Sequence, residues 1–169
     1  MENYRIARPV AALLAMAGLW SLVGLYVSGD NHHRPPALPR GVGELVTRLS
    51  GDQCLVDVWA SAASGAGGRF RALLDSGDSA SLSLTKSDAA TAGVDVGSLW
   101  FVIPYRSVSG MGLQARTTLR QLRIGGAVLR DLPAYVVSET DGMNTSLVGL
   151  PLLKQLNFSL RGDSCVVSW

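Results

Sequence analysis

Histidine, cysteine and charged side chains are scarce in this chain of 169 residues. The only histidines, His32 and His33, are adjacent in a proline-rich stretch and are interpreted as solvated side chains rather than metal ligands. Their position also argues against a Cys–His catalytic pair. Charged residues make up 17% of the chain, the net charge is +2 and no long basic run occurs, which argues against nucleic acid as a partner.

The N-terminal region contains a long uncharged segment. Residues 9–29 include no charged side chain, and about 20 apolar residues suffice to span a bilayer. We therefore predict an uncleaved transmembrane helix there. A cleaved signal peptide is the competing interpretation, although residues 27–29 make a poor cleavage site. Residues 1–8 would precede the span, the proline-rich residues 30–40 would form an extended linker, and residues 41–169 would form one globular domain.

The globular part is predicted to be all-β. Short apolar runs alternate with glycine-rich or polar turns, a pattern that suggests a closed β-barrel with two short helices. Cys54 and Cys165 lie near the two ends of this domain, and a disulfide within the chain, a disulfide across a dimer and two free thiols are all open. Strands are expected at 53–60, 69–74, 81–84, 99–104, 113–122, 132–137, 157–160 and 164–169, and helices at 85–92 and 150–156. Thr85 is expected to cap the first helix, with Asp88 completing a capping-box pattern.

The tetrapeptide Asp75-Ser76-Gly77-Asp78 is the most informative stretch of the chain. It follows an apolar strand, so Asp75 is expected at the strand end, with Ser76 able to hydrogen-bond the turn. Gly77 allows a positive φ or a close approach of a partner backbone. An acid held on such a turn is suited to general acid/base catalysis. A solvated hairpin loop is the alternative, because Asp-Ser-Gly is also a common turn sequence.

Three elements in this order resemble the retropepsin-like family of single-domain aspartic proteases, particularly its bacterial, membrane-anchored members. They are Leu73-Leu74-Asp75-Ser76-Gly77, the glycine-rich hairpin around Ser109 and Gly110, and Leu147-Val148-Gly149 followed by the helix Leu150–Leu156. The hairpin resembles the family's flap, and the third element resembles the apolar-apolar-Gly signature that closes the barrel near the active loop. The resemblance covers the chain from Cys54 to Ser168.

The resemblance implies an aspartic endopeptidase with a closed acid-protease barrel that is active as a homodimer. Two copies of Asp75 would share one proton and activate water. Ser76 would brace the loop across the dimer axis, and Gly77 would leave space for the substrate backbone. The implied partners are a peptide or protein substrate and the membrane, with no metal or organic cofactor. The implied location is the bacterial inner membrane, with a single pass through residues 9–29 and the C-terminal domain in the periplasm.

One residue departs from the family pattern. The position after Gly77 is usually Ala or Ser in this family, whereas here it is Asp78. If it points inward, beside the substrate, Asp78 would raise the pKa values of the catalytic pair by like-charge repulsion. It would then shift the pH of activity, select basic substrates or end catalysis. Pointing outward, it would do none of these. A catalytically inactive domain that binds peptides or envelope partners is therefore the second hypothesis. An unrelated small β-barrel is the third, and it would be favoured if Asp75 lay far from Gly149.

Overall fold

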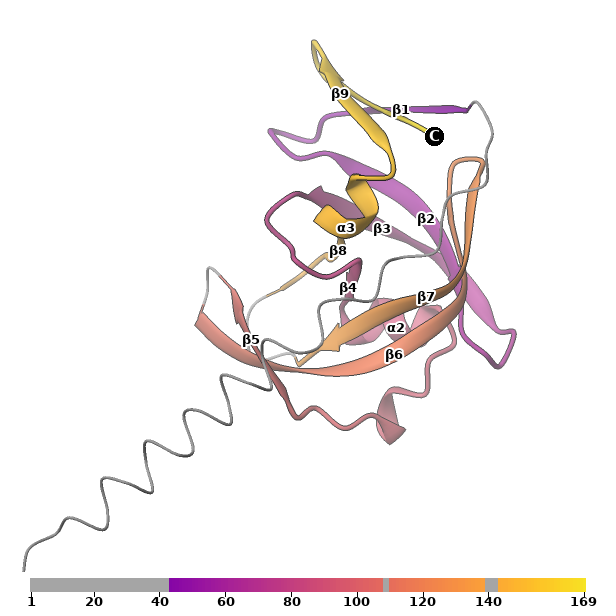
Figure 1. Cartoon of the computed structure of the whole chain (residues 1–169), viewed down its shortest axis with the longest axis vertical. Coiled ribbons are helices and arrows are strands. Elements are labelled where there is room, and N and C mark those ends of the chain that lie inside the picture. Colours follow the sequence, from indigo (N-terminus) through magenta and orange to yellow (C-terminus); the bar gives the residue numbers. More distant parts are fainter. Residues whose placement is uncertain (1–42, 108–109, 139–142) are drawn as a thin grey trace, which may run out of the picture. The chain divides into compact units, whose positions relative to one another are not determined.

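The structure is a computed structural model that describes residues 43–107, 110–138 and 143–169. The predicted tail, membrane span and linker over residues 1–40 lie outside the described residues, as does Ser109. No helix in the described part of the chain is long and apolar enough to cross a membrane. In chain order, the elements of Figure 1 are β1 (Glu44–Arg48), β2 (Leu55–Ser61), β3 (Gly67–Asp75), β4 (Leu82–Leu84), α2 (Lys86–Thr91), the 3-10 turn η1 (Val96–Ser98), β5 (Ile103–Ser107), β6 (Gly110–Ile124), β7 (Ala127–Val137), β8 (Ser146–Gly149), α3 (Leu150–Leu153), β9 (Asn157–Arg161) and β10 (Ser164–Ser168).

The larger sheet closes into a barrel. Its strands run in the order β2-β3-β8-β4-β7-β6, and β2 pairs again with β6, where Val58 lies opposite Ile124 and Ser61 opposite Gln121. Strand β5 adds to the outer side of β6 as an extension. Most neighbours are antiparallel, but β3 with β8 and β4 with β7 are parallel. The predicted all-β, closed-barrel architecture with few short helices is therefore confirmed.

The barrel interior follows from alternating apolar residues on its strands. Successive side chains of a strand point to opposite faces, so every second residue faces the core. On β2 these residues are Val56, Val58 and Ala60, all nearly inaccessible to solvent, while Leu132 and Ala134 serve the same role on β7. This packing fixes the strand register, because a shift by one residue would turn the apolar side chains outward.

Helix α2 is joined to strand β8 by a hydrogen-bond network. The Thr85 hydroxyl accepts a bond from the Asp88 N–H at 3.1 Å, which is the capping interaction expected from the sequence. The buried Ser146 hydroxyl on β8 donates to the Asp88 carboxylate at 2.6 Å and accepts from the Thr85 N–H at 3.1 Å. One buried serine thereby ties the start of the helix to the strand that leads to Gly149.

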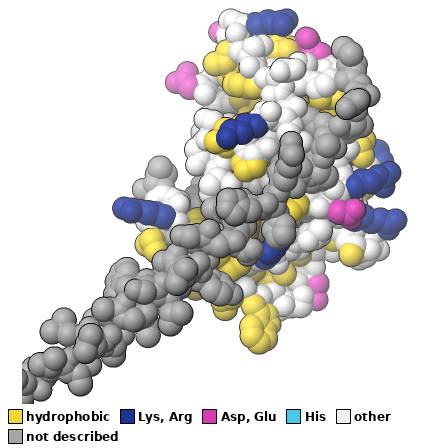
Figure 2. Space-filling view, viewed as in Figure 1, with side chains coloured by type: hydrophobic (Ala, Val, Ile, Leu, Met, Phe, Trp, Pro, Cys, Tyr) yellow, Lys and Arg dark blue, Asp and Glu magenta, His cyan; other side chains and the backbone are white. Residues whose placement is uncertain are grey.

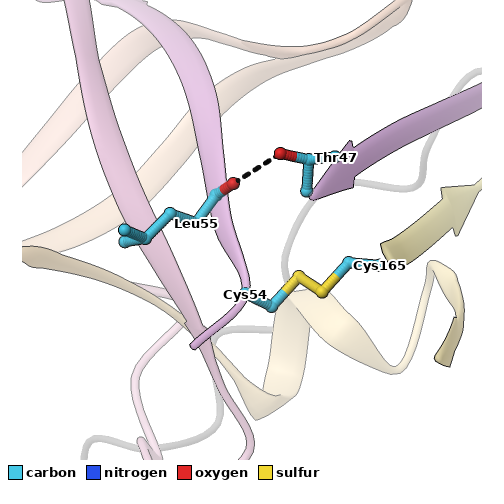
Figure 3. The surroundings of a disulfide bond; sticks show 4 residues. All are labelled: Thr47, Cys54, Leu55 and Cys165. Atoms are coloured by element: carbon cyan, nitrogen blue, oxygen red, sulfur yellow. Dashed lines mark hydrogen bonds between the residues drawn. A yellow bond between two sulfur atoms is a disulfide. The ribbon is translucent and has the colours of Figure 1, made fainter. Parts of the chain in front are cut away.

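A second sheet, in the order β1-β10-β9, brings the two ends of the domain together. A disulfide within the chain links Cys54, just before β2, to Cys165 on β10, across a sequence separation of 111 residues (Figure 3). Beside it, the Thr47 hydroxyl of β1 donates to the Leu55 carbonyl of β2 at 3.0 Å. Both links attach this smaller sheet to the barrel, and the in-chain disulfide is the alternative that the structure contains.

Several predicted boundaries were wrong. The strand expected at 99–104 begins only at Ile103, because the exposed Trp100 and Val102 alternate with half-buried residues but have no partner strand in the described part of the chain. The second helix ends at Leu153 rather than at residue 156. Strand β7 starts at Ala127, well before residue 132, because the polar residues in its first half interrupt the apolar pattern of a strand. Asp131, within β7, has a φ of 52°. Strand β1 and the turn η1 were not predicted.

Candidate active site

Asp75 is brought next to Gly149 by the parallel pairing of β3 with β8. Leu74 lies opposite Val148, and Asp75 lies opposite Gly149, each the last residue of its strand. Parallel strands end at the same edge of a sheet, so the segments that follow Asp75 and Gly149 leave the barrel together (Figure 1). The structure therefore unites the first and third elements of the sequence prediction and removes the geometric argument for an unrelated barrel.

The residues after Asp75 form a tight turn around its own carboxylate. The Gly77 N–H donates to Asp75 Oδ1 at 2.8 Å, and the Asp78 N–H donates to the Asp75 carbonyl oxygen at 3.3 Å. A Cβ atom on residue 77 would lie only 3.1 Å from Asp75 Oδ1, so Gly77 gives the carboxylate its room. The Asp75 side chain is half-buried, whereas Ser76 and Gly77 are exposed. The acid is thus held in place but remains reachable, as a catalytic carboxylate must be.

The turn is fastened to the segment that follows β8. The Leu150 N–H donates to the Asp78 carbonyl oxygen at 2.9 Å, and the Gly149 N–H donates to the Ser81 carbonyl oxygen at 3.1 Å. A Cβ atom on residue 149 would overlap the Ala80 carbonyl oxygen and lie 2.8 Å from the Asp78 carbonyl oxygen. Glycine is therefore required at position 149 because the turn passes directly across it. Leu147 and Val148 supply the strand that positions this glycine.

Asp78 is turned into the protein rather than toward solvent. Its Oδ1 accepts a hydrogen bond from the Ala80 N–H at 2.9 Å, while its Oδ2 is buried without a hydrogen-bond partner in the described part of the chain. Burial raises the pKa of the Asp78 carboxyl above its ordinary value of 3.8, and the nearby charge of Asp75 adds to that increase. The Ser83 hydroxyl and the Ala80 N–H lower the pKa, but less than burial raises it.

The hairpin between β5 and β6 occupies the place of the predicted flap. Ser107 pairs with Gly110 at its end, and Gly110 is exposed with a φ of 133°, a conformation that favours glycine. A Cβ on residue 110 would meet nothing within 4 Å, so this end of the hairpin stands clear of the other described residues. Ser109 lies outside the described residues. Nearer the base, the Tyr105 ring lies over Gly112, and the Tyr105 hydroxyl is buried without a hydrogen-bond partner among the described residues.

Sequence reasoning missed the groups that hold the turn in place. The anchoring atoms are backbone atoms of Ala80, Ser81 and Leu150, which no side-chain pattern reveals. The Ser146–Asp88 bond joins residues 58 apart, so no local spacing could indicate it. The one available signal was the polar Ser146 directly before Leu147, in a strand that is otherwise apolar. No group of three or more His, Cys, Asp or Glu residues in the described ranges could hold a metal ion.

Comparisons with known proteins agree with this geometry. The sequence profile of the aspartyl protease family matches residues 61–152, which includes both the Asp75 turn and Gly149. The chain belongs to the aspartyl protease family. A solved retropepsin-like aspartic protease from Rickettsia conorii superposes on this chain with a TM-score of 0.61 and 22% sequence identity, covering 76% of this chain and 92% of that one. No curated protein has a matching sequence.

The comparisons confirm the resemblance noted in the sequence. At 22% identity, the likeness to the solved protein shows the fold, and that fold is the retropepsin-like barrel. Together with the family match, it excludes the unrelated β-barrel. The chain thus has the family and the fold of an aspartyl protease, and both support a protease-type function.

Proposed function

We propose that this protein is an aspartic endopeptidase that works as a homodimer, with one Asp75 from each subunit in a shared active site. The observation that carries the proposal is the Asp75 turn, held by Gly77 and fastened at Gly149 and Leu150. The sequence contains this Asp-Ser-Gly turn only once. Since an aspartic protease uses two such carboxylates, one chain supplies half of a site and a second copy completes it.

The exposed edge of the smaller sheet supports dimer formation. Strand β9 pairs only with β10 among the described strands, and all five of its residues are exposed. Phe158 and Leu160, which lie on one face of β9, are 44% and 60% exposed. Figure 2 shows hydrophobic side chains at the surface over this sheet, at the top of the view. Pairing with a second β9 would satisfy the open backbone edge and cover these side chains.

The proposed reaction is hydrolysis of a peptide bond by water held between the two carboxyl groups. Two carboxylates about 3 Å apart do not ionise together, so the pair shares one proton and titrates as a unit. The ionised Asp75 takes a proton from water, and the water oxygen attacks the carbonyl carbon. The protonated Asp75 gives its proton to the carbonyl oxygen. The first Asp75 then gives the proton it took from water to the amide nitrogen, while the second Asp75 takes a proton from a hydroxyl of the diol. The C–N bond breaks, a carboxylic acid and an amine leave, and the pair again holds one proton.

The hairpin that ends at Gly110 would cover a bound peptide. Closing a hairpin over a substrate excludes water and aligns the scissile bond. Ser109 and Gly110 would contact the substrate backbone, and Ser76 would brace the two turns across the dimer axis. An extended peptide bound as an added strand would place alternate side chains in pockets of the two subunits.

The proposed location is the bacterial inner membrane, with the protease domain in the periplasm. The uncharged residues 9–29 are long enough for a single membrane span. The Cys54–Cys165 disulfide supports an oxidising compartment for the domain. A membrane anchor would also raise the effective concentration of the subunits and so favour dimers.

A catalytically inactive domain that binds peptides or envelope partners is the alternative. The buried Asp78 carboxyl next to Asp75 favours it, because a further acid from each subunit beside the pair could prevent the sharing of a single proton.

The deciding experiment is cleavage of an unfolded protein substrate by the full-length chain in detergent, from acidic to neutral pH. Asp75→Asn is the test variant, and Asp95→Asn is the matched control because Asp95 is exposed at the start of η1. The proposal expects the parent and the control to cleave and Asp75→Asn to lose about 10,000-fold in rate, the size of the loss when one essential catalytic group is removed. Peptide binding by a folded dimer without cleavage at any pH would instead support the inactive domain.

A further inference from the structure

Asp78 is a buried acid in the Asp75 turn, and the proposed reaction gives its carboxyl group no role. Its carbonyl oxygen accepts from the Leu150 N–H at 2.9 Å, and its Oδ1 accepts from the Ala80 N–H at 2.9 Å. The same residue therefore fastens the turn to the segment after β8 and shapes the chain that passes over Gly149. Its Oδ2 has no hydrogen-bond partner in the described ranges, although it is inaccessible to solvent.

A buried carboxyl oxygen without a partner favours the neutral form of the acid. Ionisation would place a negative charge where Oδ2 is shielded from water and where the donors from Ser83 and Ala80 do not offset the loss of hydration, and a poorly compensated buried charge is costly. Among the described residues, the charged group that acts on Asp78 is Asp75, at the end of β3, and its charge is of the same sign. Strand β4 contributes the uncharged Ser83 hydroxyl, while β8 and α3 contribute the backbone of Gly149 and Leu150.

We propose that Asp78 is a proton-dependent positioning residue, whose neutral carboxyl keeps the turn packed against Gly149 and whose ionisation releases that turn. The inference rests on the proposed function, because it concerns the positioning of the Asp75 pair. An ionised Asp78 gains stability by moving its carboxylate toward water. Such a movement pulls Ala80 away from Gly149 and strains the Asp78–Leu150 bond. The arrangement needed for catalysis is therefore favoured at acidic pH, and the enzyme becomes less active as Asp78 ionises.

The direction of the pH effect follows from linkage between ionisation and folding. Burial raises the pKa of Asp78 above 3.8, so the folded protein holds this proton over a pH range in which the unfolded chain has already released it. The packed turn is thus fully stable below the ordinary pKa and loses stability as the pH rises through the folded pKa. Each unit of increase in the folded pKa changes the ratio of released to packed turn about tenfold.

The test measures stability and activity separately across pH, using the full-length chain. Asp78→Asn keeps the size and the acceptor of the side chain but cannot ionise, and Asp78→Ala serves as a second variant if the amide packs poorly. Asp95→Asn again controls for loss of one exposed charge. Thermal unfolding between about pH 4 and about pH 7 should show the Tm of the parent falling relative to Asp78→Asn, by about 5 °C for each unit of raised pKa. The control should follow the parent.

The same variants give a distinct signature in catalysis. The activity of the parent should decline toward neutral pH, and Asp78→Asn should extend the active range upward by at least about one pH unit, with its rate at acidic pH retained within about threefold. Asp78→Ala should likewise lose the pH dependence, but with a lower rate and Tm throughout, because it lacks the acceptor for the Ala80 N–H. Parallel Tm curves for parent and Asp78→Asn, together with an unchanged upper limit of the pH–rate profile, would overturn the inference.

The outcome for Asp78 can be separated from the outcome for the proposed function. An Asp75→Asn chain has no activity under the proposal, but its Asp78 still titrates, so its Tm should still fall with pH and Asp78→Asn should remove most of that fall. An inactive parent with this pH-dependent Tm would reject the protease reaction and retain the role of Asp78. An active parent whose Tm does not depend on Asp78 would support the protease reaction and reject the role of Asp78.

Discussion

Replacement of Gly149 by alanine tests the central geometric feature of the site. Gly149 has a φ of −90°, which alanine also adopts, so backbone conformation does not require glycine here. What excludes a side chain is the turn itself: a Cβ would overlap the Ala80 carbonyl oxygen, lie 2.8 Å from the Asp78 carbonyl oxygen and 3.1 Å from the Ala80 carbonyl carbon. All three obstacles are backbone atoms, which cannot rotate away as a side chain can.

The expected effect on stability is that of overpacking in a tightly packed site. Overpacking costs about 1–3 kcal/mol of unfolding free energy, or a fall in Tm of about 4–12 °C for a domain of this size. The clash also pushes the Asp75 turn away from β8 and weakens the bonds donated by Gly149 and Leu150. Because a misplacement of about 1 Å in an active site can cost about 100-fold in rate, activity should fall further than stability alone explains.

A matched glycine provides the control for this variant. Gly97 in η1 is exposed, and of the described residues a Cβ there would meet Asp95 Oδ1 alone, at an ordinary 3.5 Å. Gly97→Ala should therefore leave both Tm and cleavage rate unchanged, or raise Tm slightly by restricting the unfolded chain. The measurements are thermal unfolding and cleavage at a temperature where both variants are folded. Gly149→Ala behaving like Gly97→Ala would refute the reasoning that the turn depends on this glycine.

Three further predictions concern the parts that support the site. Replacing both Cys54 and Cys165 by serine should lower the free energy of unfolding in urea by about 2–5 kcal/mol, and an unchanged midpoint would contradict a stabilising disulfide. Ser146→Ala should cost about 1–3 kcal/mol in the same assay, since Asp88 loses its buried donor, whereas Ser146→Thr should retain part of it. Leu160→Asp should raise the dissociation constant of the proposed dimer at least about tenfold, as measured by sedimentation. An unchanged dissociation constant would show that β9 is not part of the interface.

The sequence predicted those parts of the site in which short runs of residues have local meaning. The Asp75 turn and Leu147-Val148-Gly149 were identified because each combines an apolar strand with a glycine or acid at its end, and the structure places them side by side. The cap of α2 at Thr85 was predicted for the same reason, because capping depends on neighbours three residues apart.

The remainder depended on contacts that no local pattern contains. Whether Asp78 pointed inward or outward was open, because its burial is determined by β4 and by the segment after β8. The pairing of Cys54 with Cys165 was open because spacing does not reveal which strands meet. The expected strand over residues 99–104 was wrong at its start because alternation alone does not provide Trp100 with a partner strand.

The parallel pairing of β3 with β8 also affects how the chain reaches its native state. Residues Asp75 and Gly149 are far apart in the chain, and β4, β6 and β7 lie between them in sequence. Contacts of such long range form late, since the entropy lost in closing the intervening loop must first be offset by other native interactions. A nascent or partly folded chain therefore carries Asp75 on an unsupported segment. Under the proposed function, proteolytic competence would arise only once folding of the barrel is essentially complete, which limits damage by incomplete chains.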